Sequence, residues 1–169
     1  MPTPAKTVVA ILALAGGILA SGAVLAACTD AAGPGVDWRR CYMDGKDLRK
    51  VDLTGATLRG ATFARADLSE SNLSEVDGFR AKFISAKLTD IRFDGAGLEK
   101  ADLTKADLSG ASFVGANLRL ARFFRANLRG ADLTGARMRG ADLLKADLSG
   151  ATWTDGEKVC AEGSIGQCN

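Results

Sequence analysis

Large apolar residues recur at every fifth position along most of the chain. The series runs from Trp38 to Trp153 and fills 23 of the 24 positions that this period marks between residues 36 and 155. A small or apolar residue, most often Ala, stands two residues before nearly every large one, and Asp or Asn often follows it. The last two residues of each unit are usually small, polar or charged. The pattern predicts one repetitive body over residues 36–155.

The five-residue period fits neither an α-helix nor a flat strand. On a helix each step of five moves the apolar residue by about 140° around the axis, so no single apolar face forms. In a strand an odd period turns successive apolar residues to opposite faces. The small and large residues of one unit are two apart, so both can point the same way in a short extended stretch. A chain that turns once per unit and keeps these side chains on one axis is a solenoid.

Units such as ADLTKADLSGASFVGANLRL, residues 101–120, resemble the pentapeptide-repeat family, whose consensus is A(D/N)LXX. The resemblance implies an all-β fold, a right-handed, four-sided parallel β-solenoid with four units per turn. The 24 units would then form about six coils of twenty residues. In such a coil Ala forms a close-packed inner layer, and Leu, Phe and Met stack in columns. Residues 156–169 lack the repeat and are expected to cap the open end of the solenoid.

One interruption raises the question of a domain boundary. Gly78 stands where a large residue is due, with Phe79 one place late. The residues around it, Val76 and Phe83, keep the five-residue phase, so we expect a local defect rather than a boundary or a change of register. Gly78 would leave one unfilled place in the core, which Val76 fills in part. Phe79 then either points outward or is turned inward by a local bulge.

The N-terminal residues 1–27 have the features of a secretory signal peptide. Lys6 precedes an apolar run without charge, and the run ends in small residues. Gly16, Gly17 and Gly22 interrupt it, which favours a cleaved signal over a permanent membrane anchor, although about 20 apolar residues can span a bilayer. We therefore expect an exported protein.

The sequence Leu25-Ala26-Ala27-Cys28 resembles a bacterial lipobox. This resemblance implies lipidation of Cys28 and an outer-membrane lipoprotein, because Thr29 is not the Asp that is associated with inner-membrane retention. An ordinary cut after Ala26 is the competing possibility and would release the protein into the periplasm. Residues 28–35 lack periodicity and are expected to form a flexible tether.

The other three cysteines lie in the first coil and in the tail. Cys160 and Cys168 are eight residues apart, and in an exported protein this spacing predicts a disulfide that closes a small loop. Cys41 occupies an inward position far from the tail, so we expect it to be a buried free thiol. The chain has no His and no CxxC sequence, and we expect neither a metal site nor a catalytic cysteine.

The repeated aspartates have a structural interpretation. Five of them occupy the same place in their units, where a short polar side chain can accept a hydrogen bond from the turn backbone: Asp102, Asp107, Asp132, Asp142 and Asp147. No residue pattern points to catalysis or to a cofactor. We therefore expect a protein that is not an enzyme and that binds no cofactor.

Counting the chain in twenties places charged and apolar residues in surface columns. Arg59, Arg119 and Arg139 share one basic column with Phe79, and a second basic column runs through Arg125. Apolar residues at outward positions indicate a partner surface, although single exposed apolar residues also occur without a function. The candidate interaction surface consists of Phe79, Ile84, Leu120, Phe124, Leu144, Arg59, Arg119 and Arg139.

We expect this protein to be a binding or scaffold module at the bacterial cell envelope, with an unidentified protein or envelope component as its partner. The alternative is an electrostatic binder of anionic lipid or a polyanion through its Arg and Lys columns. The resemblance also implies mimicry of duplex DNA towards a topoisomerase, but the net charge is +2 rather than strongly negative. We expect no small-molecule substrate and no nucleic acid partner, and membrane association only through a lipid anchor.

Overall fold

The fold is built from a five-residue unit of three extended residues followed by a two-residue turn. A computed structural model describes residues 28–169, and the predicted signal peptide, residues 1–27, lies outside the described residues. Only the middle residue of each extended stretch forms a β-bridge, so the described chain contains no helix and no strand longer than one bridge residue. Three residues between turns leave no room for a longer ladder.

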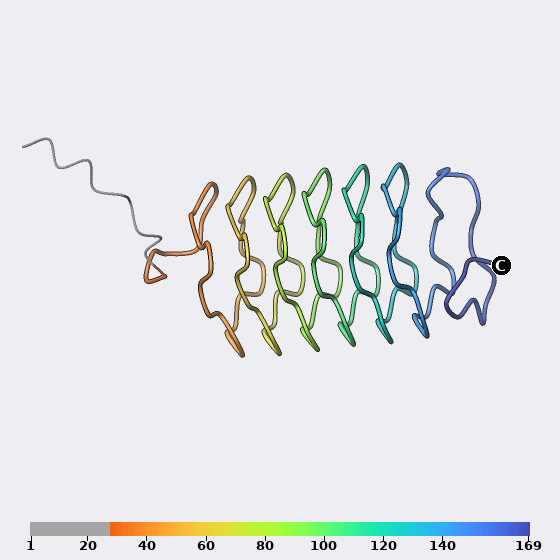
Figure 1. Cartoon of the computed structure of the whole chain (residues 1–169), viewed down its shortest axis with the longest axis horizontal. Coiled ribbons are helices and arrows are strands. Elements are labelled where there is room, and N and C mark those ends of the chain that lie inside the picture. The colour runs from red at the N-terminus through yellow and green to blue at the C-terminus, as the bar shows by residue number, and fades with distance from the viewer. Residues whose placement is uncertain (1–27) are drawn as a thin grey trace, which may run out of the picture.

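The bridges join residues that are twenty apart, all in parallel, from Asp37 with Thr57 to Asp132 with Thr152. Twenty residues and four turns therefore make one coil, and the coils stack along the long axis of the molecule (Figure 1). Each coil has four sides. We number them in chain order by their bridge residues in the first coil: Asp37, Tyr42, Asp47 and Asp52.

The interior is a set of stacked apolar columns, as the repeat predicts. The large residues and the alanines are almost fully buried from Leu53 to Leu133. Aromatic rings stack between successive coils, with ring centres 5.1 Å apart for Phe63 and Phe83. Burial of these side chains is the main source of stability in such a fold.

From Gly35 to Gly150, each turn of the repeat ends in a left-handed residue. In one example, Ala61 donates its N–H to the carbonyl of Leu58 at 3.0 Å, and Gly60 between them has a φ of 66°. Thirteen non-glycine residues among those described also adopt positive φ, between 54° and 61°. This conformation costs an L-residue about 1–2 kcal/mol relative to the right-handed one. The distribution of these residues around the solenoid is uneven, as described below.

The repeated aspartates have the predicted structural role. Each of the five accepts a hydrogen bond from the N–H two residues later, for example Asp132 from Thr134 at 2.9 Å. The others bond in the same way to Thr104, Ser109, Leu144 and Ser149. Their carboxylates stabilise turns.

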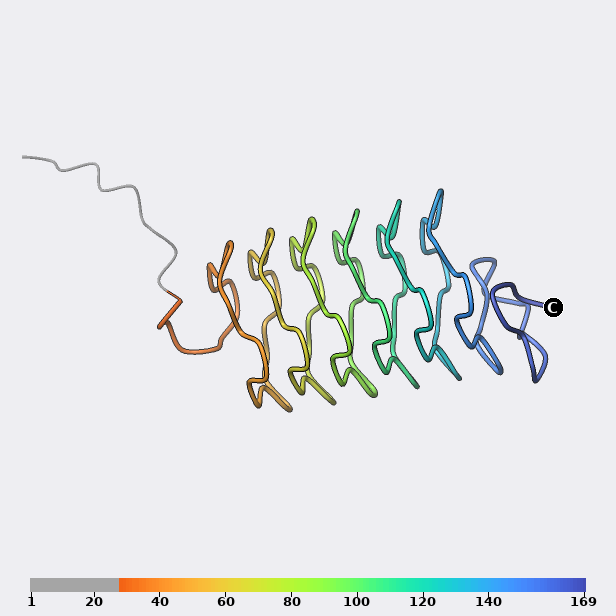
Figure 2. The same cartoon turned by 60° about the horizontal axis from the view of Figure 1, so that its bottom comes forward.

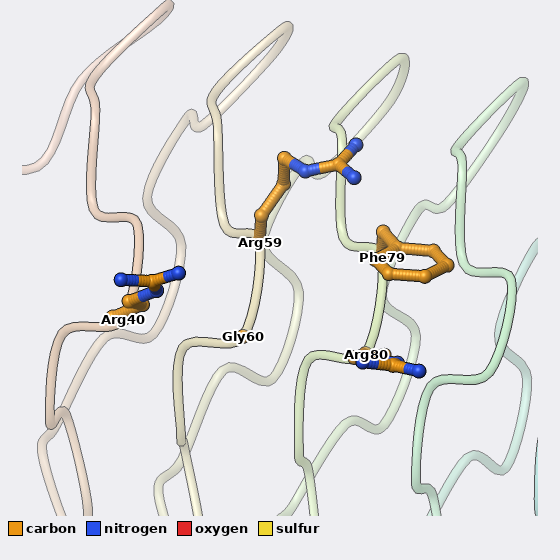
Figure 3. Close-up of a pocket in the computed structure, with 5 residues that line it drawn as sticks. All are labelled: Arg40, Arg59, Gly60, Phe79 and Arg80. Carbon is orange, nitrogen blue, oxygen red and sulfur yellow. The ribbon is translucent and has the colours of Figure 1, made fainter.

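The chain passes through Gly78 without a break. Asp77 bridges to Thr57 in the preceding coil and to Gly97 in the following one, so the predicted local defect, and not a boundary, is present. The expectation of an unfilled place is wrong. A Cβ atom on Gly78 would lie 2.7 Å from Cδ2 of Leu98, because the Leu98 side chain occupies that space. The neighbouring Phe79 points outward (Figure 3).

Residues 156–169 fold back against the last coil, at the blue end of Figure 2. Antiparallel bridges join Asp147 to Ile165 and Thr152 to Val159, so this cap covers the third and fourth sides. A disulfide joins the pair that the spacing predicts, Cys160 and Cys168. The first and second sides of the last coil lack such a cover, and their large residues Met138 and Leu143 are only partly buried.

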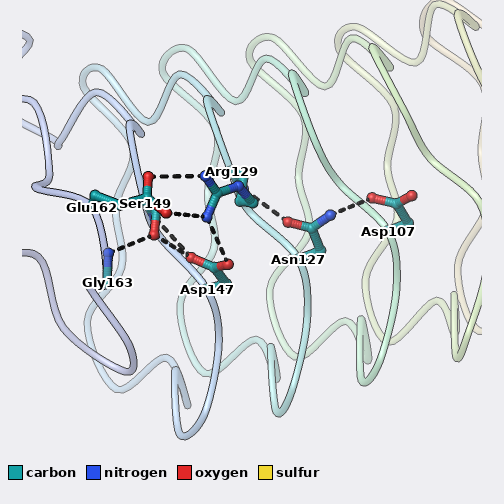
Figure 4. Close-up of polar contacts among 7 residues, drawn as sticks. All are labelled: Asp107, Asn127, Arg129, Asp147, Ser149, Glu162 and Gly163. Carbon is teal, nitrogen blue, oxygen red and sulfur yellow. Dashed lines mark hydrogen bonds and ion pairs between the residues drawn. The ribbon is translucent and has the colours of Figure 1, made fainter.

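A polar network fastens the cap (Figure 4). Arg129 donates two hydrogen bonds to Glu162, at 2.8 and 2.9 Å, and a third to Asp147 at 3.2 Å. The buried hydroxyl of Ser149 donates to Asp147 at 2.6 Å and accepts the N–H of Gly163 at 3.0 Å. Burial would raise the pKa of Asp147, but the hydrogen bonds from Ser149 and Arg129 outweigh it and lower the pKa.

The prediction that Cys41 is a free thiol is wrong, because Cys41 forms a disulfide with Cys28. Distance from the tail excludes Cys160 and Cys168 as partners, but the segment before the first coil runs close enough to reach Cys41. The same disulfide holds residues 28–35 against the first coil, where Gly35 also donates its N–H to Thr54 at 2.8 Å. This segment is therefore not a free tether.

The disulfide also bears on the predicted lipidation. Lipidation of a lipobox cysteine forms a thioether at Sγ, and the structure uses the Sγ atom of Cys28 in the bond to Cys41. One sulfur atom cannot carry both bonds. Within residues 28–169, no helix has the length and apolar character needed to cross a membrane.

Candidate binding surface

One side of the solenoid carries most of its positive charge. We define the cationic side as the second side with the turns at both of its edges. It contains thirteen basic and four acidic residues. The seven-residue segments that form it are 39–45, 59–65, 79–85, 99–105, 119–125 and 139–145.

The opposite side, defined in the same way around the fourth side, has the reverse balance. It contains four basic and seven acidic residues. Its segments are 49–55, 69–75, 89–95, 109–115, 129–135 and 149–155. The two sides share one backbone pattern, so the difference lies in the side chains alone.

The two sides also differ in how their cations are used. All four basic residues of the opposite side form ion pairs within the described chain: Arg49, Lys50, Arg92 and Arg129. The pair with Arg49 is close enough to lower the pKa of Asp47 to about 2, mainly through the side-chain hydrogen bond. These cations are compensated by nearby carboxylates.

On the cationic side, ten of thirteen basic residues have no carboxylate within 4.0 Å among residues 28–169. Only Arg39, Arg59 and Arg122 are paired, with Asp37, Asp77 and Asp102. The unpaired residues are Arg40, Arg65, Arg80, Lys82, Lys100, Lys105, Arg119, Arg125, Arg139 and Lys145. Their charge is therefore available to an external anion.

The left-handed residues that are not glycine also concentrate on the cationic side. Nine of the thirteen non-glycine residues with positive φ lie on the cationic side, and seven of these nine are Arg or Lys. Glycine occupies this turn position without steric penalty. The chain therefore accepts local strain in order to place cations at the edges of this side.

Apolar residues accompany the charges. Leu120 and Leu144 are exposed, with 47% and 60% of their surface accessible, and Tyr42 is 81% exposed. Phe79, Ile84 and Phe124 are half-buried at the same edges. The opposite side has one exposed large apolar residue among those described, Val114.

Phe79 lies at the centre of a cluster of cations (Figure 3). Arg59, Arg80 and Lys100 lie 4.7, 5.1 and 5.7 Å from the centre of its ring. A depression of about 350 Å³ opens beside it, above Gly60, and Arg40 forms the far wall. Cation–π attraction orients the guanidinium groups over the ring while leaving their charge accessible.

All eight residues of the predicted interaction surface lie on the cationic side. The prediction separated them into columns, and the structure shows that the two basic columns are the two edges of one side. Sequence reasoning missed the exposed Tyr42 and the bridge residues Lys82 and Arg122 on the same side. The twenty-residue count contained this signal, because 42, 82 and 122 share one column.

The described residues contain no group of three or more His, Cys, Asp or Glu side chains placed to hold a metal ion. The geometry is that of an extended charged surface with a shallow depression. An arrangement of this kind can bind a partner.

The repeat matches a known family. The family model described as pentapeptide repeats matches in eight copies, over residues 47–77, 81–119 and 121–152. The chain belongs to the pentapeptide-repeat family. The stack of coils is therefore a right-handed β-solenoid, as the resemblance implied. No curated protein sequence matches the chain significantly.

Several solved structures are similar to the chain. HetL, which is involved in heterocyst differentiation regulation in Nostoc sp. strain PCC 7120, is 29% identical over 74% of this chain and 64% of its own, with a TM-score of 0.32. QnrB1, a plasmid-mediated fluoroquinolone resistance protein, is 22% identical over 72% of this chain and 68% of its own, with a TM-score of 0.46. A pentapeptide-repeat protein of the Arabidopsis thaliana thylakoid lumen is 30% identical over 73% of this chain and 84% of its own, with a TM-score of 0.33.

Proposed function

We propose that this chain is a non-enzymatic binding module of the bacterial cell envelope, and that it engages an anionic partner through its cationic side. The binding surface would extend over six coils, residues 36–155, with the disulfide-closed tail as a cap. The ten unpaired cations on one side carry the proposal, because the opposite side pairs every one of its own. Uncompensated charge of one sign attracts an oppositely charged partner.

Export to the periplasm fits this function. Residues 28–169 contain two disulfides, and such bonds persist in oxidising compartments. The signal-like segment 1–27 supports the same compartment. Because Cys28 is paired with Cys41, we propose the unacylated periplasmic form over the outer-membrane lipoprotein. The intact mass of the exported protein tests this: an acylated Cys28 would contradict it.

A second candidate is a scaffold that binds a protein through the apolar residues Leu120, Phe124 and Leu144. Their grouping on one side favours it. Salt separates the two functions, since attraction to an anion weakens steeply with ionic strength and an apolar contact does not. Mimicry of duplex DNA is disfavoured, because the largest accumulation of charge on this solenoid is positive.

The test is affinity capture from envelope extracts, read by mass spectrometry at rising salt. The variant Arg119→Glu/Arg139→Glu reverses two unpaired cations of the cationic side. Its matched control, Arg49→Glu/Lys50→Glu, makes the same charge change on the opposite side. We expect capture to fall at least tenfold in the first variant and to stay near wild type in the control. Equal losses in both variants would contradict the proposal, and a loss only with Phe124→Asp would favour the apolar scaffold.

A further inference from the structure

We infer, building on the proposed function, that the anionic partner is the surface of a phospholipid bilayer. The cationic side would lie flat on the headgroups, with Leu120, Phe124 and Leu144 in the interface. Its shape is the first argument. Neighbouring coils in a parallel ladder are about 4.8 Å apart, so five steps extend over roughly 24 Å. The parallel bridges keep the six segments of this side in one straight row, which suits a planar partner.

The position of the unpaired cations is the second argument. Five follow the edge between the first and second sides: Arg40, Arg80, Lys100, Arg119 and Arg139. Four follow the other edge: Arg65, Lys105, Arg125 and Lys145. Two rows of long, solvated side chains can reach headgroup phosphates on both sides of a flat contact. Lipids diffuse, so their phosphates can adjust to cations that are unevenly spaced along each row.

The apolar residues are the third argument, and they distinguish a bilayer from a soluble polyanion. Leu120 lies at one edge of the cationic side and Phe124 and Leu144 at the other, all in the last two coils, and Leu120 and Leu144 are exposed. The cap leaves this side of the last coil uncovered, where Leu143 is also partly accessible. Apolar side chains beside cations gain free energy by entering the headgroup and acyl boundary. A soluble polyanion would leave these side chains in water.

The experiment measures co-flotation of the exported, processed protein with vesicles. One set of vesicles consists of phosphatidylcholine alone. The other set is an equal mixture of phosphatidylcholine and phosphatidylglycerol. We expect at least tenfold stronger binding to the anionic vesicles, because each cation near an anionic surface contributes about 1 kcal/mol, roughly fivefold in affinity. Any N-terminal lipid anchor contributes to both vesicle types and leaves this ratio unchanged.

Two matched pairs of variants test the contact. Arg119→Glu/Arg139→Glu should lower binding to anionic vesicles at least tenfold, and Arg49→Glu/Lys50→Glu should not. Leu144→Ser should lower it about threefold or more, because an apolar side chain no longer enters the interface. Val114→Ser is its control, since Val114 occupies the same place in its unit on the opposite side.

Soluble polyphosphate separates failure of this inference from failure of the proposed function. If polyphosphate binds through the cationic side while anionic vesicles bind no better than neutral ones, the bilayer inference is overturned and the proposed function stands. If the charge reversals on the cationic side change neither polyphosphate nor vesicle binding more than the control does, both are overturned. If Leu144→Ser behaves like Val114→Ser, insertion of the apolar residues is overturned.

Discussion

The cationic side and the opposite side of this solenoid share one repeat, one backbone and one interior, and they differ in what their turns carry. On the opposite side, glycine fills seven of the twelve second turn positions, and every cation is paired with a carboxylate. On the cationic side, glycine fills three of the twelve, and most cations are unpaired. The opposite side therefore has the turn residues and ion pairs that favour folding, whereas the cationic side has fewer of both.

The comparison shows which parts of the repeat can vary and which cannot. The interior must repeat, because each coil packs on its neighbours and a buried side chain of a different size or polarity would disturb that packing. The turns are free to vary as long as the left-handed position is tolerated. A left-handed Arg or Lys is less stable there than glycine, so a row of them indicates a role other than folding.

The largest expected effect should not distinguish the two sides. Leu103 lies beneath the cationic side and Leu133 beneath the opposite side, and both are fully buried. The two variants to compare are Leu103→Asp and Leu133→Asp. Each variant would place a carboxyl group in the apolar columns, and we expect each to lose about 4 kcal/mol or more of unfolding free energy. Chemical denaturation measures this. A large difference between the two would show that the interior is not equivalent on the two sides.

Loss of one arginine should separate the sides in stability. Arg129→Ala on the opposite side removes the ion pairs that hold the cap, and Arg139→Ala on the cationic side removes no ion pair in the described chain. Both arginines occupy the same place in their units. We expect Arg129→Ala to lower the Tm by about 2–4 °C and Arg139→Ala to leave it unchanged. Equal Tm values for the two variants would contradict the structural role of Arg129.

Glycine at the left-handed position should separate stability from binding. Arg125 and Glu75 have φ values of 58° and 60°, one on each side. We expect Arg125→Gly and Glu75→Gly each to raise the free energy of unfolding by about 0.5–1 kcal/mol, because glycine adopts this conformation without strain. Only Arg125→Gly should weaken anion binding. If Glu75→Gly weakened it as much, the two sides would not differ in function.

The smallest effect concerns pH. The hydroxyl and the N–H of Thr54 lower the pKa of Asp52, on the opposite side. A carboxylate with a lowered folded pKa stabilises the fold above its ordinary pKa of 3.8, and this contribution is lost as pH falls through the folded value. We expect Asp52→Asn to show a smaller fall in Tm than wild type between pH 7 and pH 3. Arg and Lys keep their charge over this range, so the cationic side remains charged. An unchanged fall would contradict the role of Asp52.

Much of the fold follows from local spacing. The five-residue period predicted the solenoid and the structural role of Asp102 and its equivalents, because these depend on residues within one unit. The twenty-residue coil was an implication of the resemblance to the pentapeptide-repeat family. The same spacing placed the predicted interaction residues in columns. It could not show that Phe79 is surrounded by three cations, since long side chains choose their partners only once neighbouring coils are in place.

The cysteines show the limit of the same reasoning. Cys160 and Cys168 belong to one short loop, so their spacing was sufficient to predict the pair. The distance of Cys41 from the tail predicts a free thiol only as long as the path of residues 28–35 is unknown. That path depends on how the segment packs on the first coil, which no repeat describes.

The sequence by itself determined the repeat, the register through Gly78 and the columns in which charged and apolar residues recur, because these follow from spacing along the chain. The tertiary structure decided the rest. It placed Leu98 in the space beside Gly78, paired Cys28 with Cys41, and left the cations of one side without carboxylates. These outcomes depend on distances between side chains of adjacent coils, which a linear pattern does not contain.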